Sequence, residues 1–96
     1  MQGSSVVNIR HEQCDVYCGR PSFVGNPYEI GRDGTREEVI SKYKIWFYNK
    51  IKDITFRDRV LKLHNKRLGC WCKPLACHCD IIVEYLNNYY NIQDYV

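Results

Sequence analysis

The stretch LGCWCKPLACHCD, residues 68–80, places four cysteines and one histidine within ten positions. Thiolate sulfur and imidazole nitrogen are ligands that zinc prefers in proteins. A cysteine thiolate is also the nucleophile of thiol enzymes, whereas other buried cysteines simply pack as small apolar side chains. The segment therefore has three interpretations: a metal site, a reactive thiol centre or a set of structural thiols.

The metal interpretation depends on a strand, a turn and a helix. Cys70 and Cys72 lie two positions apart, so their side chains share one face of a strand. Cys77 and His78 follow at the expected start of a helix, and the four side chains could close a tetrahedral zinc site. Neighbouring helical residues point about 100° apart, which is awkward for ligands at 77 and 78. The thiols that could replace or add a ligand are Cys14, Cys18 and Cys79.

A catalytic interpretation uses the same residues differently. Cys77 at a helix N-terminus would experience the positive end of the helix dipole, which favours its thiolate. His78 or Asp80 would then move protons. However, adjacent Cys77 and His78 are poorly placed to bond each other, and Asp80 and Glu84 do not form the H-x-E motif of zinc deaminases. Ligand binding without turnover is therefore the preferred prediction, and an enzyme acting on nucleotides or nucleic-acid bases is the alternative.

A second group of polar residues lies in the turn-rich segment 19–35. Arginine forks, glycine N–H groups and a helix start are what phosphate recognition requires. The segment contains no Walker loop or dinucleotide fingerprint, and Asp33-Gly34 and Thr35 also suit a simple turn and helix cap. We expect a phosphate-bearing small molecule or a nucleotide as the ligand. The expected ligand-binding residues are Arg20, Ser22, Asn26, Arg32 and Thr35.

Nucleic acid is a weaker alternative as the partner. The formal net charge of +3 favours anionic partners only slightly. The tyrosines of segment 85–95 have almost no positive charge around them, so core or dimer packing is favoured over base stacking there. The aromatic residues that could stack on a base or ribose near the turn-rich segment are Tyr17, Phe23 and Tyr28.

Local patterns predict the elements that position these residues. Val6–Arg10 and Asp15–Arg20 are expected strands, separated by a gap short enough for a hairpin. Thr35 and Glu38 form a capping box before a helix over residues 36–51. The remaining predicted elements are a helix over 55–65, a strand over Leu68–Cys72 and a helix from Ala76 or Cys77 to about Asn91.

The order β-β-α-α-β-α predicts an α/β or α+β fold. A small, single-layer, three-stranded sheet would be covered by three helices. With 96 residues and 45% hydrophobic composition, residues 1–96 are expected to form one domain. Fraying is expected at residues 1–5 and 92–96.

The N-terminal segment MQGSSVVNIR lacks the basic and apolar regions of a signal peptide, and no apolar run is long enough to span a membrane. We therefore expect a cytoplasmic protein without membrane contact, whose thiols stay reduced. The six cysteines are then interpreted as ligands, catalytic groups or core residues, with a disulfide scaffold as the alternative.

Four strings, VVNIR, DVYxGRPS, GNPYxIGRDGTREEVIxKY and LGCWCKPLACHxD, together resemble a family of short phage and bacterial proteins, domain-of-unknown-function family 4326. The resemblance covers about residues 6–88. It implies a phage or prophage origin, hence the cytoplasm of a host cell, and implies no particular activity. A phage protein that sequesters a host factor or a signalling nucleotide is therefore a further alternative.

The resemblance also assigns residues. The chain departs from the family pattern at Cys14, Cys18 and Cys79, which makes these three poorer candidates for a shared chemistry. The residues onto which the pattern carries over are Arg20, Ser22, Gly25, Asn26, Pro27, Arg32, Cys70, Cys72, Pro74, Cys77, His78 and Asp80.

Overall fold

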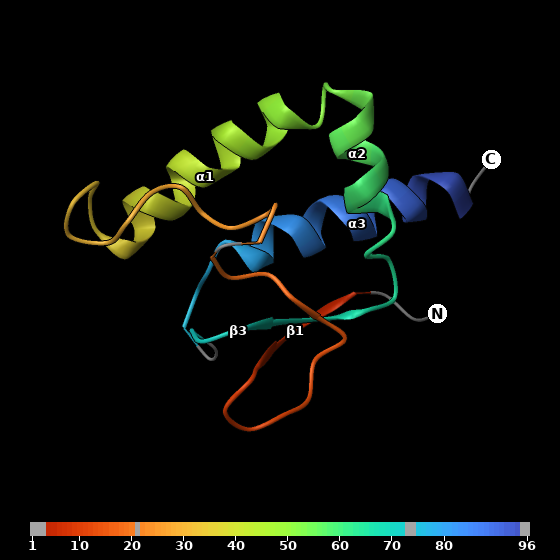
Figure 1. Cartoon of the computed structure of the whole chain (residues 1–96). Helices are drawn as coiled ribbons and strands as arrows, with labels where there is room; N and C mark the ends of the chain where they lie inside the picture. Colours follow the sequence, from red (N-terminus) through yellow and green to blue (C-terminus); the bar gives the residue numbers. More distant parts are fainter. Residues whose placement is uncertain (1–3, 21, 73–74, 95–96) are drawn as a thin grey trace.

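The computed structural model describes residues 4–20, 22–72 and 75–94, with side chains up to Tyr90. Within these ranges the helices lie on one side of the strands (Figure 1). The predicted element order and the mixed α/β class are confirmed. The elements are β1 (Ser5–Asn8), β2 (Val16–Tyr17), α1 (Arg36–Lys50), α2 (Ile54–Leu61), β3 (Arg67–Cys70) and α3 (Cys79–Asp94).

The sheet has the order β1-β3-β2, and both outer strands run parallel to the central β3. Val6 and Val16 pair with Leu68 from opposite sides. The predicted hairpin is therefore wrong, because a hairpin would place β1 and β2 side by side and antiparallel. The physical reason is the burial of β3: Leu68, Gly69 and Cys70 are all buried, as is typical of a central strand in a parallel sheet.

Gly69 shows how the second face of β3 is covered. Leu68 and Cys70 belong to the core on the helix side, so the residue between them faces the opposite way. A Cβ at Gly69 would lie 2.5 Å from the Cys14 sulfur and 2.6 Å from Ile9 Cγ2. The connection between β1 and β2 thus crosses directly over β3, and this close approach requires glycine.

Helix α1 begins at the predicted capping box. The Thr35 hydroxyl accepts the Glu38 N–H at 3.2 Å, and the Glu38 carboxylate accepts the Thr35 N–H at 2.8 Å. Hydrogen bonds from the backbone N–H and the side chain of Thr35 to the Glu38 carboxylate lower the pKa of this carboxyl. The carboxylate therefore contributes its stabilisation above its ordinary pKa, and the contribution is lost as the pH falls into the acid range.

We expect Thr35→Ala to lower the free energy of unfolding by about 1 kcal/mol, because the helix loses the hydroxyl that satisfies its third N–H group. Urea denaturation followed by circular dichroism measures this change. Thr35→Ser keeps the hydroxyl and serves as the control, expected within about 0.5 kcal/mol of the parent. Equal stability of Thr35→Ala and the parent would contradict the cap.

Two boundaries differ from the prediction in a way that matters for the cysteines. β3 ends at Cys70 rather than at Cys72, and α3 begins at Cys79 rather than earlier. Cys72, Cys77 and His78 therefore lie in the connection between strand and helix. Their side-chain directions do not follow strand or helix periodicity.

The ends of the chain are only partly described. Ser4 is buried, its N–H donates to Asn87 Oδ1 at 3.2 Å and its hydroxyl donates to the Leu63 carbonyl at 3.0 Å, so the chain is held just before β1. Within the described part, no helix has the length and apolar character needed to cross a lipid bilayer. The predicted features that lie outside the described residues are the fraying at residues 1–3 and 95–96 and the part of the turn between the expected strand and helix at residues 73–74.

The core lies between the helices and the sheet. Buried Tyr43 of α1 donates its hydroxyl to the Val24 carbonyl at 2.7 Å. This bond fastens the irregular segment between β2 and α1 to the helix. α2 ends at Leu61, before the predicted residue 65, and the chain then turns through Asn65 with φ of 64°. The largest fully buried side chains include Tyr43, Phe47, Leu68, Ile82 and Leu86.

Candidate functional site

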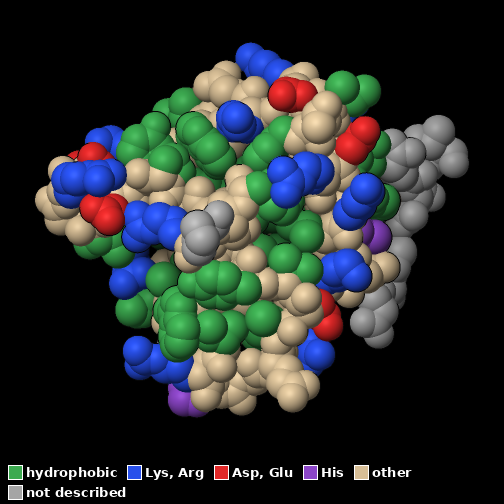
Figure 2. All heavy atoms as spheres, in the orientation of Figure 1, with side chains coloured by type: hydrophobic (Ala, Val, Ile, Leu, Met, Phe, Trp, Pro, Cys, Tyr) green, Lys and Arg blue, Asp and Glu red, His purple; other side chains and the backbone are tan. Residues whose placement is uncertain are grey.

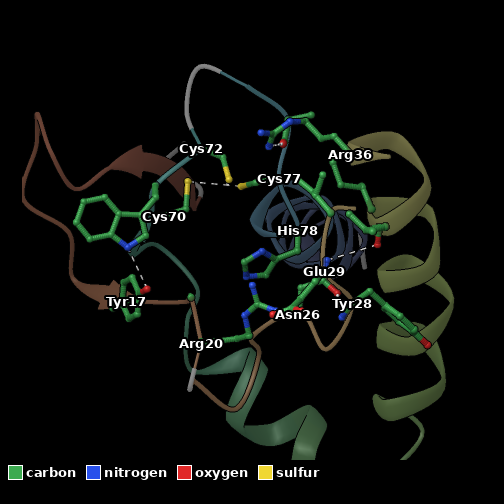
Figure 3. Close-up of a pocket in the computed structure, with 16 residues that line it drawn as sticks. Tyr17, Arg20, Asn26, Tyr28, Glu29, Arg36, Cys70, Cys72, Cys77 and His78 are labelled. Atoms are coloured by element: carbon green, nitrogen blue, oxygen red, sulfur yellow. Dashed lines mark hydrogen bonds and ion pairs between the residues drawn. The ribbon is translucent and has the colours of Figure 1, made fainter. Parts of the chain in front are cut away.

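A cavity of about 600 Å³ lies at the carboxyl edge of the parallel sheet. Its walls come from the segment after β2, the first turns of α1 and the connection between β3 and α3 (Figure 3). Ligands of open α/β sheets bind at this edge, where strands end and helices begin. The volume is within the range of small-molecule sites. This cavity is therefore the candidate ligand site.

Of the five predicted ligand-binding residues, the structure places two at the cavity. Arg20 and Asn26 line it, whereas Ser22, Arg32 and Thr35 do not. The Ser22 hydroxyl accepts a hydrogen bond from a backbone N–H in its own turn, and Thr35 is occupied by the helix cap. The start of α1 is thus already capped by protein groups.

Arg32 turns into its own loop. Its guanidinium donates to the Pro27 carbonyl at 3.1 Å and pairs with the carboxylates of Asp33 at 2.7 Å and Glu29 at 3.1 Å. These contacts raise the pKa of Arg32 and lower that of Asp33. The geometry gives Arg32 a role in shaping the loop.

Two arginines do reach the cavity, from opposite walls. The stem of Arg20 packs against Gly25, where an added Cβ would lie 3.2 Å from Arg20 Cγ. Its guanidinium lies 3.5 Å from the Glu29 carboxylate. Arg36 donates from Nη1 to the Ala76 carbonyl at 3.1 Å. Because a guanidinium has five N–H donors, both arginines retain donors for an anionic ligand.

Asn26 lines the cavity and also holds in place the wall that is formed by the segment between β2 and α1. Its Oδ1 accepts the Tyr28 N–H at 2.9 Å, which closes a tight turn, and its Nδ2 donates to the Val39 carbonyl at 3.4 Å. Tyr28, which also lines the cavity, has the Lys42 ammonium 5.9 Å from its ring centre. The turn-rich segment is therefore bound to α1 through this asparagine.

An aromatic pair lies on another side of the cavity. Trp71 is 53% exposed, and its indole N–H donates to the Tyr17 hydroxyl at 3.1 Å. The Arg10 guanidinium lies 5.3 Å from the Trp71 ring centre. A Cβ at Gly19 would collide with the Tyr17 hydroxyl, so glycine admits the ring. A large exposed ring held on two sides is suited to stacking on a planar ligand.

Cysteine thiols meet beside the cavity. The sulfur atoms of Cys70, Cys77 and Cys79 lie within 4.8 Å of one another. Those of Cys70 and Cys77 are 3.5 Å apart (Figure 3). The Cys18 side chain, directly after β2, lies beside the Cys79 thiol, and its sulfur is 3.8 Å from the Val16 carbonyl. All four side chains are buried. We call these residues the thiol cluster; three of them are close enough to hold a metal ion.

The other predicted metal ligands, Cys72 and His78, lie outside the group of mutually close atoms formed by Cys70, Cys77 and Cys79, and His78 Nε2 approaches the Cys79 sulfur at 3.8 Å. Cys72 is half-buried and lines the cavity. His78 Nε2 lies 2.6 Å from the Cys18 carbonyl, and because a carbonyl only accepts, this nitrogen carries the proton. Burial lowers the pKa of His78, so the ring is neutral at pH 7.

The remaining predicted proton carrier, Asp80, accepts the Cys77 N–H at 3.1 Å just before α3. The carboxylate thus helps to position the start of the helix. Asp80 is hydrogen-bonded to the backbone N–H of Cys77, and His78 is hydrogen-bonded to the backbone carbonyl of Cys18. These contacts give both side chains positioning roles.

Inside the thiol cluster, a free thiolate is disfavoured. Hydrogen bonds to the thiols of Cys18, Cys70 and Cys77, followed by burial, raise the pKa of the Cys79 thiol far above its ordinary value. The unmetallated thiol is therefore protonated and a poor nucleophile. A bound cation would reverse this preference, because a metal ion deprotonates the thiols that coordinate it.

The sequence matches the family model described as "Domain of unknown function (DUF4326)" over residues 3–88. The chain belongs to this family. The uncharacterized 12.4 kDa protein in the nrdA-td intergenic region of Enterobacteria phage T4 is 41% identical over 85 residues, which cover 85% of this chain and 76% of that protein. The predicted family resemblance is confirmed, and with it the similarity to phage proteins. No solved structure matches the chain.

Residues that carry the family resemblance gather at the cavity. These residues come from two segments that are far apart in the sequence, the segment after β2 and the connection between β3 and α3. The fold brings the two segments together around the cavity. Cys18 and Cys79, where this chain departs from the family pattern, belong to the thiol cluster but do not line the cavity. The resemblance residues that line the cavity are Arg20, Asn26, Cys70, Cys72, Cys77 and His78.

Two residues of the site escaped the sequence analysis. Arg36 is in the first turn of an amphipathic helix, where a charged side chain is usually just solvated, and only its bond to Ala76 brings it to the cavity. Trp71 lies between Cys70 and Cys72, which were expected to share one face of a strand, so its ring would lie on the opposite face. A large aromatic residue there is the signal that could have identified the stacking surface.

Proposed function

We propose that this phage-type domain binds a phosphate-bearing ligand of the nucleotide class in the cavity, without converting it. The observation that carries the proposal is the combination of two arginines and an exposed tryptophan–tyrosine pair around one hollow. Arginine donates to phosphate oxygens in a planar fork, and an indole stacks on a nucleobase. Such a ligand is present in the cytoplasm of a host cell, where we propose that the protein acts.

A small ligand is favoured over a nucleic-acid strand. Among the described residues on the face in Figure 2, Lys and Arg side chains are scattered between acidic and hydrophobic ones. A strand of nucleic acid is usually tracked by a continuous basic groove. A single cavity with cationic and aromatic groups on different walls suits one nucleotide better.

Binding without turnover is supported by the positions of the candidate catalytic groups. Cys77 is 3% exposed and its thiol contacts Cys70 at 3.5 Å. His78 and Asp80 bond backbone groups. A nucleophile needs a neighbouring base that can take its proton. His78 Nε2 lies 3.8 Å from the Cys79 sulfur, but this nitrogen carries the proton that it donates to the Cys18 carbonyl and so cannot act as that base.

We include zinc in the proposal, held by the thiol cluster. Cys70 and Cys77 both belong to the cluster and line the cavity. A metal ion there would fix the distance between the end of β3 and the start of α3. The metal would thus order one wall of the ligand site, a structural role that leaves the ligand untouched.

The test is thermal unfolding of the protein with AMP, ADP, ATP or inorganic phosphate at millimolar concentration. A ligand at about 100 times its Kd raises the free energy of unfolding by about 2.7 kcal/mol. For a domain of this size, Tm then rises by on the order of 10 °C. Chromatography of the nucleotide after incubation should show it unchanged.

Matched arginine variants make this test specific. Arg20→Ala and Arg36→Ala should each remove most of the ligand-induced Tm shift, because both guanidiniums line the cavity. Arg32→Ala is the control and should keep the shift, because Arg32 pairs within its own loop. The absence of a shift with all four compounds would count against the cavity as a phosphate site. A converted nucleotide would show that the domain is an enzyme.

A further inference from the structure

The geometry points to a specific coordination sphere: we infer that Cys18, Cys70, Cys77 and Cys79 together bind one zinc ion in a closed four-sulfur site. This inference rests on the zinc part of the proposed function and names its ligands. It requires no ligand in the cavity. It also differs from the expected mixed set, because Cys72 and His78 would take no part.

The separations between the sulfur atoms suit a single tetrahedral ion. A Zn–S bond is about 2.3 Å long, which places two sulfurs of a tetrahedral site about 3.8 Å apart. The sulfurs of Cys70, Cys77 and Cys79 lie within 4.8 Å of one another, and the closest pair is 3.5 Å apart. Small rotations of the side chains would bring the three to coordination distance.

Cys18 supplies the fourth sulfur from a different part of the chain. Its side chain lies beside the Cys79 thiol, and its sulfur is 3.8 Å from the Val16 carbonyl. It follows β2 directly, and its backbone N–H donates to the Gly69 carbonyl at 3.0 Å, which places it beside the end of β3. The residue is therefore held next to Cys70 by the parallel pairing of the two strands.

The cluster is closed to solvent. The exposed fractions are 0% for Cys18, 2% for Cys70, 3% for Cys77 and 0% for Cys79. Catalytic zinc sites keep one position for water or substrate, whereas structural sites have four protein ligands. A buried set of four sulfurs is thus the donor set of a structural site. Thiolates alone, in a tetrahedral arrangement, favour zinc among divalent ions.

The fold also has a mechanical reason for such a site. β2 is only two residues long, and its neighbours Arg67 and Gly69 provide few backbone bonds to hold it. An ion bound to Cys18 and Cys79 would join the end of β2 to the first residue of α3. It would thereby close loops that span most of the chain, which is where a cross-link removes the most conformational entropy from the unfolded state.

The two remaining cysteines are internal controls. Cys14 packs against Gly69 on the opposite face of β3 from Cys70. Cys72 is half-buried in the cavity wall, whereas the four thiols of the inferred site are all buried. If the six cysteines were only core residues, replacing any of them would have no effect on metal content. The four-sulfur site predicts that metal binding is unaffected by replacing Cys14 or Cys72 and is weakened by replacing one of the four ligands.

The experiment measures metal content and cobalt spectra on the full chain purified without chelator. We expect one zinc per chain in the parent protein. After exchange to cobalt, the thiolate-to-cobalt charge-transfer band should have the intensity of four thiolates, and the visible bands should be those of a tetrahedral ion. Cys18→Ser and Cys79→Ser should lower zinc affinity at least about 100-fold, since each removes one ligand. Cys14→Ser, Cys72→Ser and His78→Asn should keep one zinc per chain.

The cobalt spectrum of the parent protein keeps the inference testable when a variant fails to fold. A spectrum of three thiolates and one imidazole, or loss of zinc in Cys72→Ser or His78→Asn with retention in Cys18→Ser, would overturn the four-sulfur set while leaving zinc in place. A protein without bound metal, or with a disulfide between Cys70 and Cys77, would overturn both the set and the zinc part of the proposed function. Neither result would affect the arginine variants, which report on the cavity.

Discussion

Removal of zinc with a chelator is expected to abolish most of the cooperative thermal unfolding transition. Structural zinc sites bind their ion with apparent free energies of about 10–16 kcal/mol at pH 7. Small domains have total free energies of unfolding of about 5–15 kcal/mol. Because the proposed ion would join β2 to α3 through Cys18 and Cys79, its loss would remove an interaction as large as the whole stability.

Circular dichroism melts with EDTA, and with EDTA followed by excess zinc, measure this effect. The second sample should regain the transition of the untreated protein. Cys14→Ser and Cys72→Ser are matched controls, because both remove a thiol outside the thiol cluster and should respond to chelation like the parent. An unchanged melting curve, with metal loss verified in the same sample, would refute a structural ion.

The second large effect is expected from Phe47→Ala, which should lower the free energy of unfolding by about 4 kcal/mol. Phe47 is fully buried in α1, and its ring centre lies 5.6–6.1 Å from four other aromatic rings. Truncation removes these contacts and leaves a cavity that the surrounding rings fill only partly. The rings that contact Phe47 are Tyr43, Tyr48, Phe56 and Tyr85.

Urea titration at constant zinc concentration measures the change. Ile45→Ala is the control on the same helix: Ile45 is 67% exposed, and its truncation should change stability by no more than about 0.5 kcal/mol. Phe47→Leu keeps an apolar side chain, so its loss of stability should lie between those of Phe47→Ala and Ile45→Ala. This variant still gives a measurable value if Phe47→Ala is unfolded. A loss below about 1 kcal/mol for Phe47→Ala would contradict the aromatic core.

The two proposals are physically connected. Cys70 and Cys77 belong to the thiol cluster and also line the cavity, so the ion would order the wall that separates Arg36 from Trp71. A phosphate-bearing ligand should therefore bind the zinc-loaded protein more tightly than the chelated one, because the chelated protein must first order this wall. The ligand and the ion remain separately testable through Arg20 and Cys79.

Some features of this protein were determined by the sequence alone. The capping box of Thr35 and Glu38 and the apolar spacing behind it predict α1 almost to the residue. The order of the elements and the location of a cysteine cluster at the junction of β3 and α3 were also correct. These features depend on residues within a few positions of one another, so local backbone energetics and side-chain spacing suffice to identify them.

Other features were decided only by tertiary structure. β1 and β2 pair with β3, which lies 62 and 52 residues further along the chain, rather than with each other, because a buried central strand forms more contacts than a hairpin of short strands. That pairing, invisible to local patterns, places Cys18 beside Cys70 and moves the thiol cluster away from Cys72. The hydrogen bond from Arg36 of α1 to Ala76, forty residues away, likewise brings this arginine to a cavity that it shares with Trp71. Which side chains meet at the site depends on strand register and loop closure, which are properties of the whole chain.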